Sequence, residues 1–132
     1  MAYESILIVD DHPANVKLLS VLLRTRGYQL RTAFDAGEAL TVLSDFHPQL
    51  ILLDLQMPGI DGLALTRWLR ENPKYRDVII VAVTAYAMNG DAARARAAGC
   101  DGYITKPIDT RTFLGTVASY LAREPQQHMT GS

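Results

Sequence analysis

The sequence predicts an α/β protein in which five strand-then-helix units, (βα)5, form a doubly wound parallel sheet. Short runs dense in branched apolar residues alternate along the chain with longer stretches whose apolar residues repeat at helical spacing. Continuous apolar runs of this length are typical of strands buried on both faces. Enough chain follows each of the first four runs for one crossover helix, so we expect a three-layer sandwich with helices on both faces of the sheet.

The strands are predicted from these apolar runs and the helices from their end signals. Pro13 suits the first turn of the first helix, and Gly27 fits the position after its end. Asp35 and Asp61 can each cap the start of a helix, because an aspartate side chain accepts the free N–H groups there. The expected strands cover residues 6–9, 28–33, 50–53, 78–83 and 102–105, and the last two helices are expected over about 89–98 and from Asp109 onward.

The composition excludes several classes of protein. The 132 residues suit one domain, predicted over 1–123, with a polar tail without regular structure over 124–132. The 13 Lys and Arg against 14 Asp and Glu give a net charge of -1, which argues against nucleic acid or an anionic membrane as partner. Cys100 is the single cysteine, so an intrachain disulfide is impossible, and a cytoplasmic location is expected. No apolar stretch approaches the roughly 20 residues that span a bilayer.

Polar residues follow four of the five predicted strands. Asp10 and Asp11 follow the first strand, Asp54 the third, Thr84 the fourth and Lys106 the fifth. In an open α/β sheet, ligands bind outside the carboxyl ends of the strands. We therefore expect three carboxylates, one hydroxyl and one ammonium group to converge at a single site.

The residue types at this site point to phosphoryl chemistry with a metal ion. Three neighbouring carboxylates repel one another, so they need a cation, and the fitting ion for oxygen ligands beside a phosphate is Mg²⁺. Asp54 can accept the phosphoryl group as an aspartyl phosphate. Lys106 can neutralise one phosphoryl oxygen and Thr84 can hydrogen-bond to another.

Each residue also has an ordinary structural interpretation when taken alone. An aspartate after a strand, such as Asp10 or Asp11, is often only a helix cap. Thr84 alone is typical of a strand end, and Lys106 alone is typical of a solvated surface charge. For His12, a surface position on the first helical turn is favoured over a metal ligand, because a hard oxygen site does not need imidazole.

Four segments carry a more specific pattern than any single residue. They read ILIVDD (6–11), LILLDLQMPGIDG (50–62), VAVTAYA (81–87) and GYITKP (102–107). In this order and at this spacing they resemble the response-regulator receiver domain of two-component signalling, over almost the whole chain from Ile6 to about Leu121. The resemblance implies a flavodoxin-like fold with strand order 2-1-3-4-5.

The resemblance also implies the metal site and the phosphoacceptor. Asp54 would be phosphorylated, and Asp10 and Asp11 would hold Mg²⁺. Asp11 and Asp54 would be direct ligands, and the backbone carbonyl of Gln56 would complete the protein's share.

The same resemblance implies a switch. Thr84 would be the switch hydroxyl, Tyr103 the switch aromatic and Lys106 the phosphate partner, with a cis peptide bond before Pro107. A cis bond fixes a turn and can aim the preceding lysine into the site. Pro58, within Met57-Pro58-Gly59, is expected to terminate the third strand and let the loop turn, and Asp61 and Gly62 then start the third helix.

A receiver acts as a phosphoacceptor switch and not as an enzyme in the usual sense, although it catalyses its own phosphorylation and dephosphorylation. The expected donor is a histidine kinase or a histidine phosphotransfer protein, and the expected output is a protein that reads the face formed by the fourth helix, fifth strand and fifth helix. The sequence over residues 83–107 resembles receivers of the hybrid-kinase and single-domain cell-cycle types. The chain is then a stand-alone regulator or a receiver cut from a longer protein.

Three other functions fit these residues less well. A haloacid-dehalogenase-like phosphatase needs a second aspartate two residues after the nucleophile, where Gln56 stands. A flavodoxin-like FMN carrier needs a neutral phosphate loop after the first strand, where Asp10 and Asp11 would repel the phosphate. A degenerate receiver would lack one of the key residues, all of which are present. The resemblance to receivers also implies that Gln56 and Tyr86 occupy variable positions that set the rate of dephosphorylation, where a bulky Tyr86 would hinder the attacking water and give a long-lived phosphoryl group.

Overall fold

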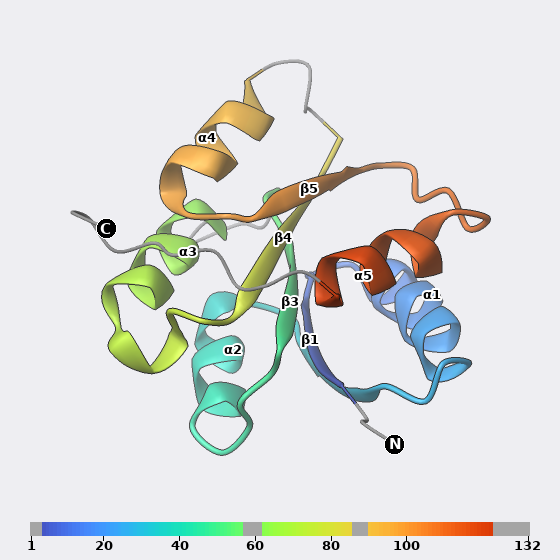
Figure 1. Cartoon of the computed structure of the whole chain (residues 1–132), viewed down its shortest axis with the longest axis horizontal. Coiled ribbons are helices and arrows are strands. Elements are labelled where there is room, and N and C mark those ends of the chain that lie inside the picture. The colour runs from blue at the N-terminus through green and yellow to red at the C-terminus, as the bar shows by residue number, and fades with distance from the viewer. Residues whose placement is uncertain (1–3, 57–61, 86–89, 123–132) are drawn as a thin grey trace.

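Five parallel strands form the central sheet, in the order β2-β1-β3-β4-β5 (Figure 1). The computed structural model describes residues 4–56, 62–85 and 90–122. The strands are β1 (Ser5–Val9), β2 (Gln29–Ala33), β3 (Leu50–Asp54), β4 (Ile79–Thr84) and β5 (Gly102–Thr105). This order and the parallel pairing confirm the predicted fold.

Helices cover both faces of the sheet, as the crossover connections require. They are α1 (Pro13–Arg24), α2 (Ala36–Leu43), α3 (Gly62–Glu71), α4 (Asp91–Ala98) and α5 (Phe113–Leu121), with a short 3₁₀ helix η1 (Pro73–Tyr75) after α3. α1 and α5 lie on one face, and α2, α3 and α4 lie on the other (Figure 1). Among the described residues, no helix has the length and apolar character to cross a membrane.

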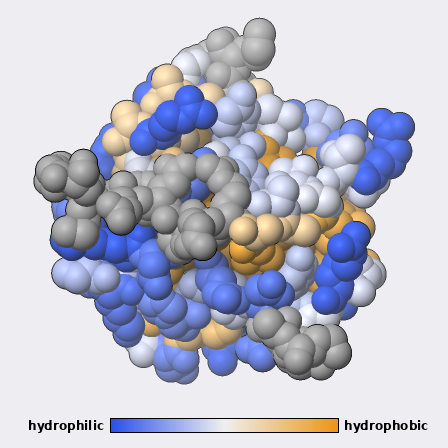
Figure 2. All heavy atoms as spheres, viewed as in Figure 1, coloured by the Kyte–Doolittle hydropathy of each residue, from blue (hydrophilic) through white to orange (hydrophobic). Residues whose placement is uncertain are grey.

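Alternation along the strands divides the core into two layers. Leu7, Ile51 and Ile80 point toward α2, α3 and α4, while their neighbours Ile6 and Leu50 point toward α1 and α5. β1, β3 and β4 are buried nearly throughout because helices cover both faces. Charged and polar side chains occupy most of the outer surface in the view of Figure 2, with apolar atoms visible near its middle.

The ends of the elements follow the predicted signals with one clear exception. Asp35 caps α2 by accepting the N–H of Glu38 at 2.7 Å, and Glu38 in turn accepts the N–H of Phe34 at 2.8 Å. This reciprocal pair satisfies two free donors at the helix start. Gly27 and Gly99 adopt positive φ after α1 and α4, as their stop positions predict.

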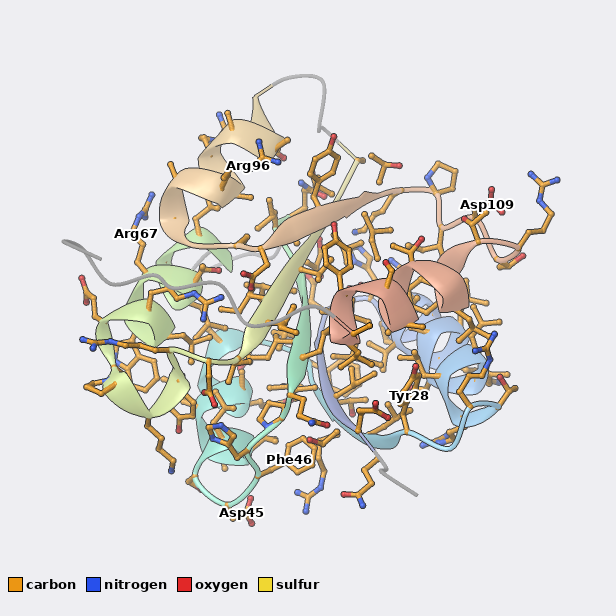
Figure 3. The ribbon with its side chains drawn as sticks, viewed as in Figure 1. Tyr28, Asp45, Phe46, Arg67, Arg96 and Asp109 are labelled. Carbon is orange, nitrogen blue, oxygen red and sulfur yellow. The ribbon has the colours of Figure 1, made fainter. Side chains whose placement is uncertain are left out.

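The exception is the start of α5, which begins at Phe113 and not at Asp109. The Asp109 side chain accepts the backbone N–H of Arg111 at 3.0 Å, and its carbonyl accepts those of Thr112 and Phe113. The chain therefore makes a separate turn before the helix, and a capping residue alone did not reveal it. Asp109 lies on this outer loop in Figure 3, where Arg67 and Arg96 also project outward from α3 and α4.

Some sequence predictions fall outside the described residues. They concern the cap at Asp61, the turn at Pro58, the bulk of Tyr86 and the tail over 124–132.

Candidate phosphoacceptor and metal site

The carboxyl ends of four strands bring the predicted site residues together. Asp10 follows β1, Asp54 is the last residue of β3, Thr84 is the last residue of β4 and Lys106 follows β5. Asp10, Asp54 and Thr84 are each at most 2 % exposed. The sheet thus places polar groups in a buried setting, where each needs a partner.

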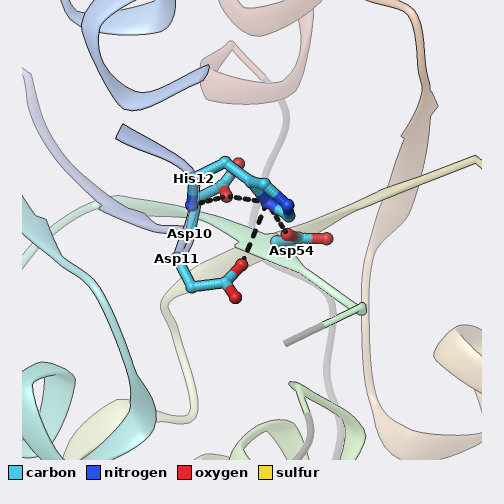
Figure 4. A group of neighbouring side chains, drawn as sticks. All are labelled: Asp10, Asp11, His12 and Asp54. Atoms are coloured by element: carbon cyan, nitrogen blue, oxygen red, sulfur yellow. Dashed lines mark hydrogen bonds and ion pairs between the residues drawn. The ribbon is translucent and has the colours of Figure 1, made fainter. Parts of the chain in front are cut away.

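The three aspartates form a compact cluster with His12. One ligand atom from each of Asp10, Asp11, His12 and Asp54 lies within 4.8 Å of all the others (Figure 4). The backbone N–H of His12 donates to Oδ1 of Asp10 at 2.9 Å, which ties the start of α1 to the site. These are the three carboxylates that the strand ends predict.

Two oxygens of the cluster are buried without a hydrogen bond. Among the described residues, Oδ1 of Asp11 and Oδ2 of Asp54 have no hydrogen-bond partner. A buried carboxylate oxygen is costly when nothing balances its charge. Both oxygens face the cluster, and Asp11 and Asp54 are the residues predicted as direct ligands. The donor set is all oxygen apart from His12, so it fits Mg²⁺.

The pKa of Asp10 reflects its burial beside a second carboxylate. Burial raises the pKa of Asp10, and the neighbouring charge of Asp54 adds to this rise. The hydrogen bond from the backbone of His12 and the charge of Lys106 oppose it. A bound dication would favour the ionised form of all three carboxylates.

Asp54 is held from one side only. Nζ of Lys106 donates to Oδ1 of Asp54 at 3.0 Å, and the backbone N–H of Gln56 donates to the same oxygen at 2.9 Å. The Lys106–Pro107 peptide bond is cis, as the sequence predicts. Oδ1 is therefore fixed by two donors, while Oδ2 points toward His12 and the acids.

Thr84 bonds to a residue that sequence reasoning missed. Its hydroxyl donates to Oδ2 of Asp91 at 2.7 Å, and Nε2 of Gln56 contacts both Thr84 Oγ1, at 2.7 Å, and Asp91 Oδ2, at 3.0 Å. Arg94 pairs with the other oxygen of Asp91. Asp91 is the first residue of α4 and is 6 % exposed. The only sequence signal was an acid in a first helical turn, which is ordinary at that position.

Gly62 holds α3 against the backbone of the site. A Cβ at this position would lie 2.9 Å from the carbonyl oxygen of Asp54 and 3.2 Å from Cγ of Leu53. No real side chain fits at the first distance, so the start of α3 can approach the end of β3 only with glycine there. This gives the predicted structural role of Gly62 a physical cause.

Tyr103 lies on β5, away from the acids. It is 38 % exposed and lines a cavity of about 220 Å³ between β5 and α5, together with Phe113 and Thr116. The ring of Tyr103 therefore lies at the surface beside this cavity.

Comparisons with known proteins show the family of this chain. Residues 6–118 match the family model described as response regulator receiver domain. The chain is 42% identical over 118 residues to the polar-differentiation response regulator DivK of Brucella ovis, covering 89% of this chain and 96% of that protein.

Solved structures show the same fold. The Vibrio cholerae chemotaxis response regulator CheY4 superposes with a TM-score of 0.85 at 26% identity, covering 90% of this chain and 99% of that one. The receiver domain of sensor histidine kinase PA1611 from Pseudomonas aeruginosa PAO1 superposes with a TM-score of 0.83 at 30% identity, covering 92% and 100%. That structure has a magnesium ion coordinated in its active-site cleft.

A parallel sheet in the order 2-1-3-4-5 with acids at its carboxyl edge defines a class of CheY-like signalling domains. Within that class, the chain belongs to the response regulator receiver domain family of two-component systems.

Proposed function

We propose that this protein is a phosphoacceptor switch that takes a phosphoryl group from a phosphohistidine donor onto Asp54. The observation that carries the proposal is the asymmetric environment of the Asp54 carboxylate. Lys106 and the backbone of Gln56 hold Oδ1, while the buried Oδ2 has no hydrogen bond within the described part of the chain. One carboxylate oxygen is thus oriented by two donors, and the other faces the acidic cluster that would hold the metal ion.

The transfer has a simple balance of atoms and charge. A carboxylate oxygen of Asp54 attacks the phosphorus, the P–N bond of the phosphohistidine breaks, and its electron pair stays on the departing imidazole, which takes up a proton. Water later hydrolyses the acyl phosphate, which releases inorganic phosphate and restores the carboxylate. The protein therefore promotes its own phosphorylation and dephosphorylation.

The chain's own residues position the transfer and balance its charge. Asp10, Asp11 and Asp54 would hold Mg²⁺, with the backbone carbonyl of Gln56 as a further ligand. When bound, Mg²⁺ supplies charge neutralisation and a template for in-line transfer. Nζ of Lys106, already 3.0 Å from Asp54, is placed to bind an oxygen of the phosphoryl group.

The output follows from the contacts of Thr84. A phosphoryl group on Asp54 offers new acceptor oxygens, and Thr84 can bind one only by leaving Asp91. Because Asp91 begins α4, that exchange alters how this helix is held. Tyr103 then turns into the space beside Thr84, and the α4-β5-α5 face changes for a partner protein to read.

The partners that suit this chemistry are proteins. The donor is a histidine kinase or a histidine phosphotransfer protein, and the target binds the α4-β5-α5 face. We propose that the protein acts as a single-domain regulator, because it matches nearly the full length of DivK. We also propose that it acts in the cytoplasm, which its single, buried thiol at Cys100 supports.

A phosphatase function is disfavoured by the contacts of Gln56. The side chain that would have to be an acid in a haloacid-dehalogenase-like enzyme is an amide bonded to Thr84 and Asp91. An amide cannot exchange a proton with a leaving group.

Incubation with acetyl phosphate and Mg²⁺ tests the proposal. We expect an acid-stable, base-labile phosphoprotein by intact mass, and none with Asp54→Asn. Asp45→Asn is the matched control, because the Asp45 side chain is 73% exposed. Labelling that persists in Asp54→Asn, or that is absent from the wild-type protein, would refute the assignment.

A further inference from the structure

The imidazole of His12 faces the acidic cluster rather than solvent alone. Its Nδ1 lies 3.0 Å from Oδ1 of Asp11, 3.3 Å from Oδ1 of Asp10 and 3.7 Å from Oδ2 of Asp54 (Figure 4). One nitrogen thus approaches all three carboxylates. The sequence favoured a surface histidine here, and the side chain is indeed 57% exposed, but its Nδ1 borders the acidic site.

Local backbone structure leaves the ring available to the acids. His12 is the N-cap residue of α1, but its side chain makes no capping hydrogen bond. Its N–H is bonded to Asp10, and Pro13 occupies the first helical turn, where the proline ring fixes φ. The imidazole therefore makes no capping bond to the helix, and its Nδ1 lies next to the acids.

The spacing of the donor atoms is slightly wider than that of a coordination shell. In an octahedral site with ligands at about 2.1 Å, neighbouring donors are about 3 Å apart and opposite donors about 4 Å apart. The four atoms here lie within 4.8 Å of one another. Oδ2 of Asp54, on a side chain with 0% exposure, supplies an independent sign of a missing ligand because it has no hydrogen bond in the described part of the chain.

We propose that Nδ1 of His12 is a metal ligand in this site, so that the site discriminates in favour of first-row transition dications such as Co²⁺, Ni²⁺ or Zn²⁺. Imidazole is a good ligand for these ions and a poor one for Mg²⁺, which prefers oxygen. The tautomer with its proton on Nε2 presents a lone pair on Nδ1 to the metal. The inference rests on the metal site of the proposed function and adds a residue that sets its selectivity.

The test measures metal affinity directly. Tag-free protein, stripped of metal, is titrated separately with Co²⁺ and Mg²⁺ by calorimetry, and the visible absorption of bound Co²⁺ reports a change from nitrogen to oxygen ligation. We expect His12→Ala to weaken Co²⁺ binding by about tenfold or more, with Mg²⁺ affinity changed less than about twofold. His47→Ala is the matched control. The side chain of His47 is 44% exposed and so is solvent-accessible like that of His12, but it pairs with Asp77 and not with the acids of the site. It should change neither affinity.

Two outcomes would overturn the inference. Equal Co²⁺ affinity and an unchanged Co²⁺ spectrum in His12→Ala would show that the ring does not bind metal. Equal gains in affinity for both ions would show that the imidazole is only a counter-ion of the metal-free acids. Phosphorylation of the wild-type protein and of His12→Ala by acetyl phosphate with Mg²⁺ is measured in parallel. If both are phosphorylated, a negative metal result rejects the His12 inference alone, whereas failure of the wild-type protein rejects the proposed function.

Discussion

The hydroxyl of Thr84 donates to the carboxylate of Asp91 at 2.7 Å, so the end of β4 and the start of α4 are joined by one hydrogen bond. Gln56 bonds to both residues and to the backbone N–H of Ala85, at 3.3 Å. Three elements therefore meet at a small polar network directly beside Asp54. This network competes with a phosphoryl group for the same hydroxyl.

Asp91→Ala should favour the phosphorylated form. The substitution removes an acceptor that holds Thr84 and an anion close to the site, and a hydrogen bond to a charged group contributes about 1.5–3 kcal/mol. At subsaturating acetyl phosphate, the ratio of phosphorylated to unphosphorylated protein should rise on the order of tenfold. Intact-mass measurement gives the ratio, with Asp109→Ala as the control on an exposed loop. An unchanged ratio in a folded Asp91→Ala protein would rule out the competition.

Gly62→Ala should destabilise the protein. The added Cβ meets the Asp54 carbonyl at 2.9 Å and Cδ2 of Leu55 at 3.1 Å, and overpacking of this kind costs about 1–3 kcal/mol. Urea unfolding measures the change in free energy. Gly115→Ala is the matched control, because nothing lies within 4 Å of a Cβ there, and alanine in a helix should stabilise by about 0.5–1 kcal/mol. The prediction fails if both variants change stability in the same direction.

Arg70→Met should be more damaging than most substitutions on a helix. The guanidinium, on a side chain only 8% exposed, pairs with Asp101 at 2.8 Å and donates to the carbonyls of Gly99, Tyr75 and Arg76. Burial lowers the pKa of Arg70, and the nearby Asp101 charge opposes this shift. Removing one partner of such a pair costs about 3–5 kcal/mol in unfolding free energy.

The control for that measurement is Arg67→Met on the exposed side of α3, which should stay within about 0.5 kcal/mol of the wild-type protein. Equal effects of the two substitutions would show that burial of Arg70 adds no stability.

Cys100 should be unreactive in the folded protein. Burial raises the pKa of its thiol from 9.0 to about 11, and the hydrogen bond with Thr66 and the charge of Arg70 only partly oppose this. A thiol reagent at pH 8 should therefore modify urea-unfolded protein rapidly and native protein only through rare unfolding. Similar rates in both states would contradict the prediction.

The same shift predicts a pH dependence of stability. The unfolded thiol ionises near its ordinary pKa of 9.0, whereas the folded thiol stays protonated up to about 11. Unfolding is therefore favoured progressively as the pH rises between these values, while below pH 9 the thiol has no effect. Cys100→Ala should remove this component of the decline, which urea titrations at several pH values would reveal.

The sequence predicted the parts of the site that depend on strand periodicity. Asp10, Asp54 and Thr84 follow apolar runs, and the carboxyl ends of parallel strands meet at one edge, so their convergence could be anticipated. The pairing of Thr84 with Asp91 could not, because it depends on how closely α4 packs against β4. Nor could the position of the His12 ring, which is a choice among side-chain rotamers.

The contact between Arg70 and Asp101 was also beyond sequence reasoning. The two residues lie 31 positions apart, Arg70 on α3 and Asp101 in the loop before β5, and no spacing rule joins them. Helix starts were predicted well where a cap side chain decides them, as at Asp35, and less well at α5, where a turn from Asp109 precedes the helix.

The two ends of α4 are anchored by different kinds of contact. At its carboxyl end, Gly99 packs against the stem of Arg70 and gives its carbonyl to that buried guanidinium. At its amino end, Asp91 accepts hydrogen bonds from Gln56 and from Thr84, and Thr84 is the hydroxyl that we propose binds a phosphoryl oxygen. The carboxyl end of α4, near Gly99, is thus fixed more firmly than its amino end. Any displacement of the helix that starts at the site should be largest at its first turn and should decrease toward Gly99.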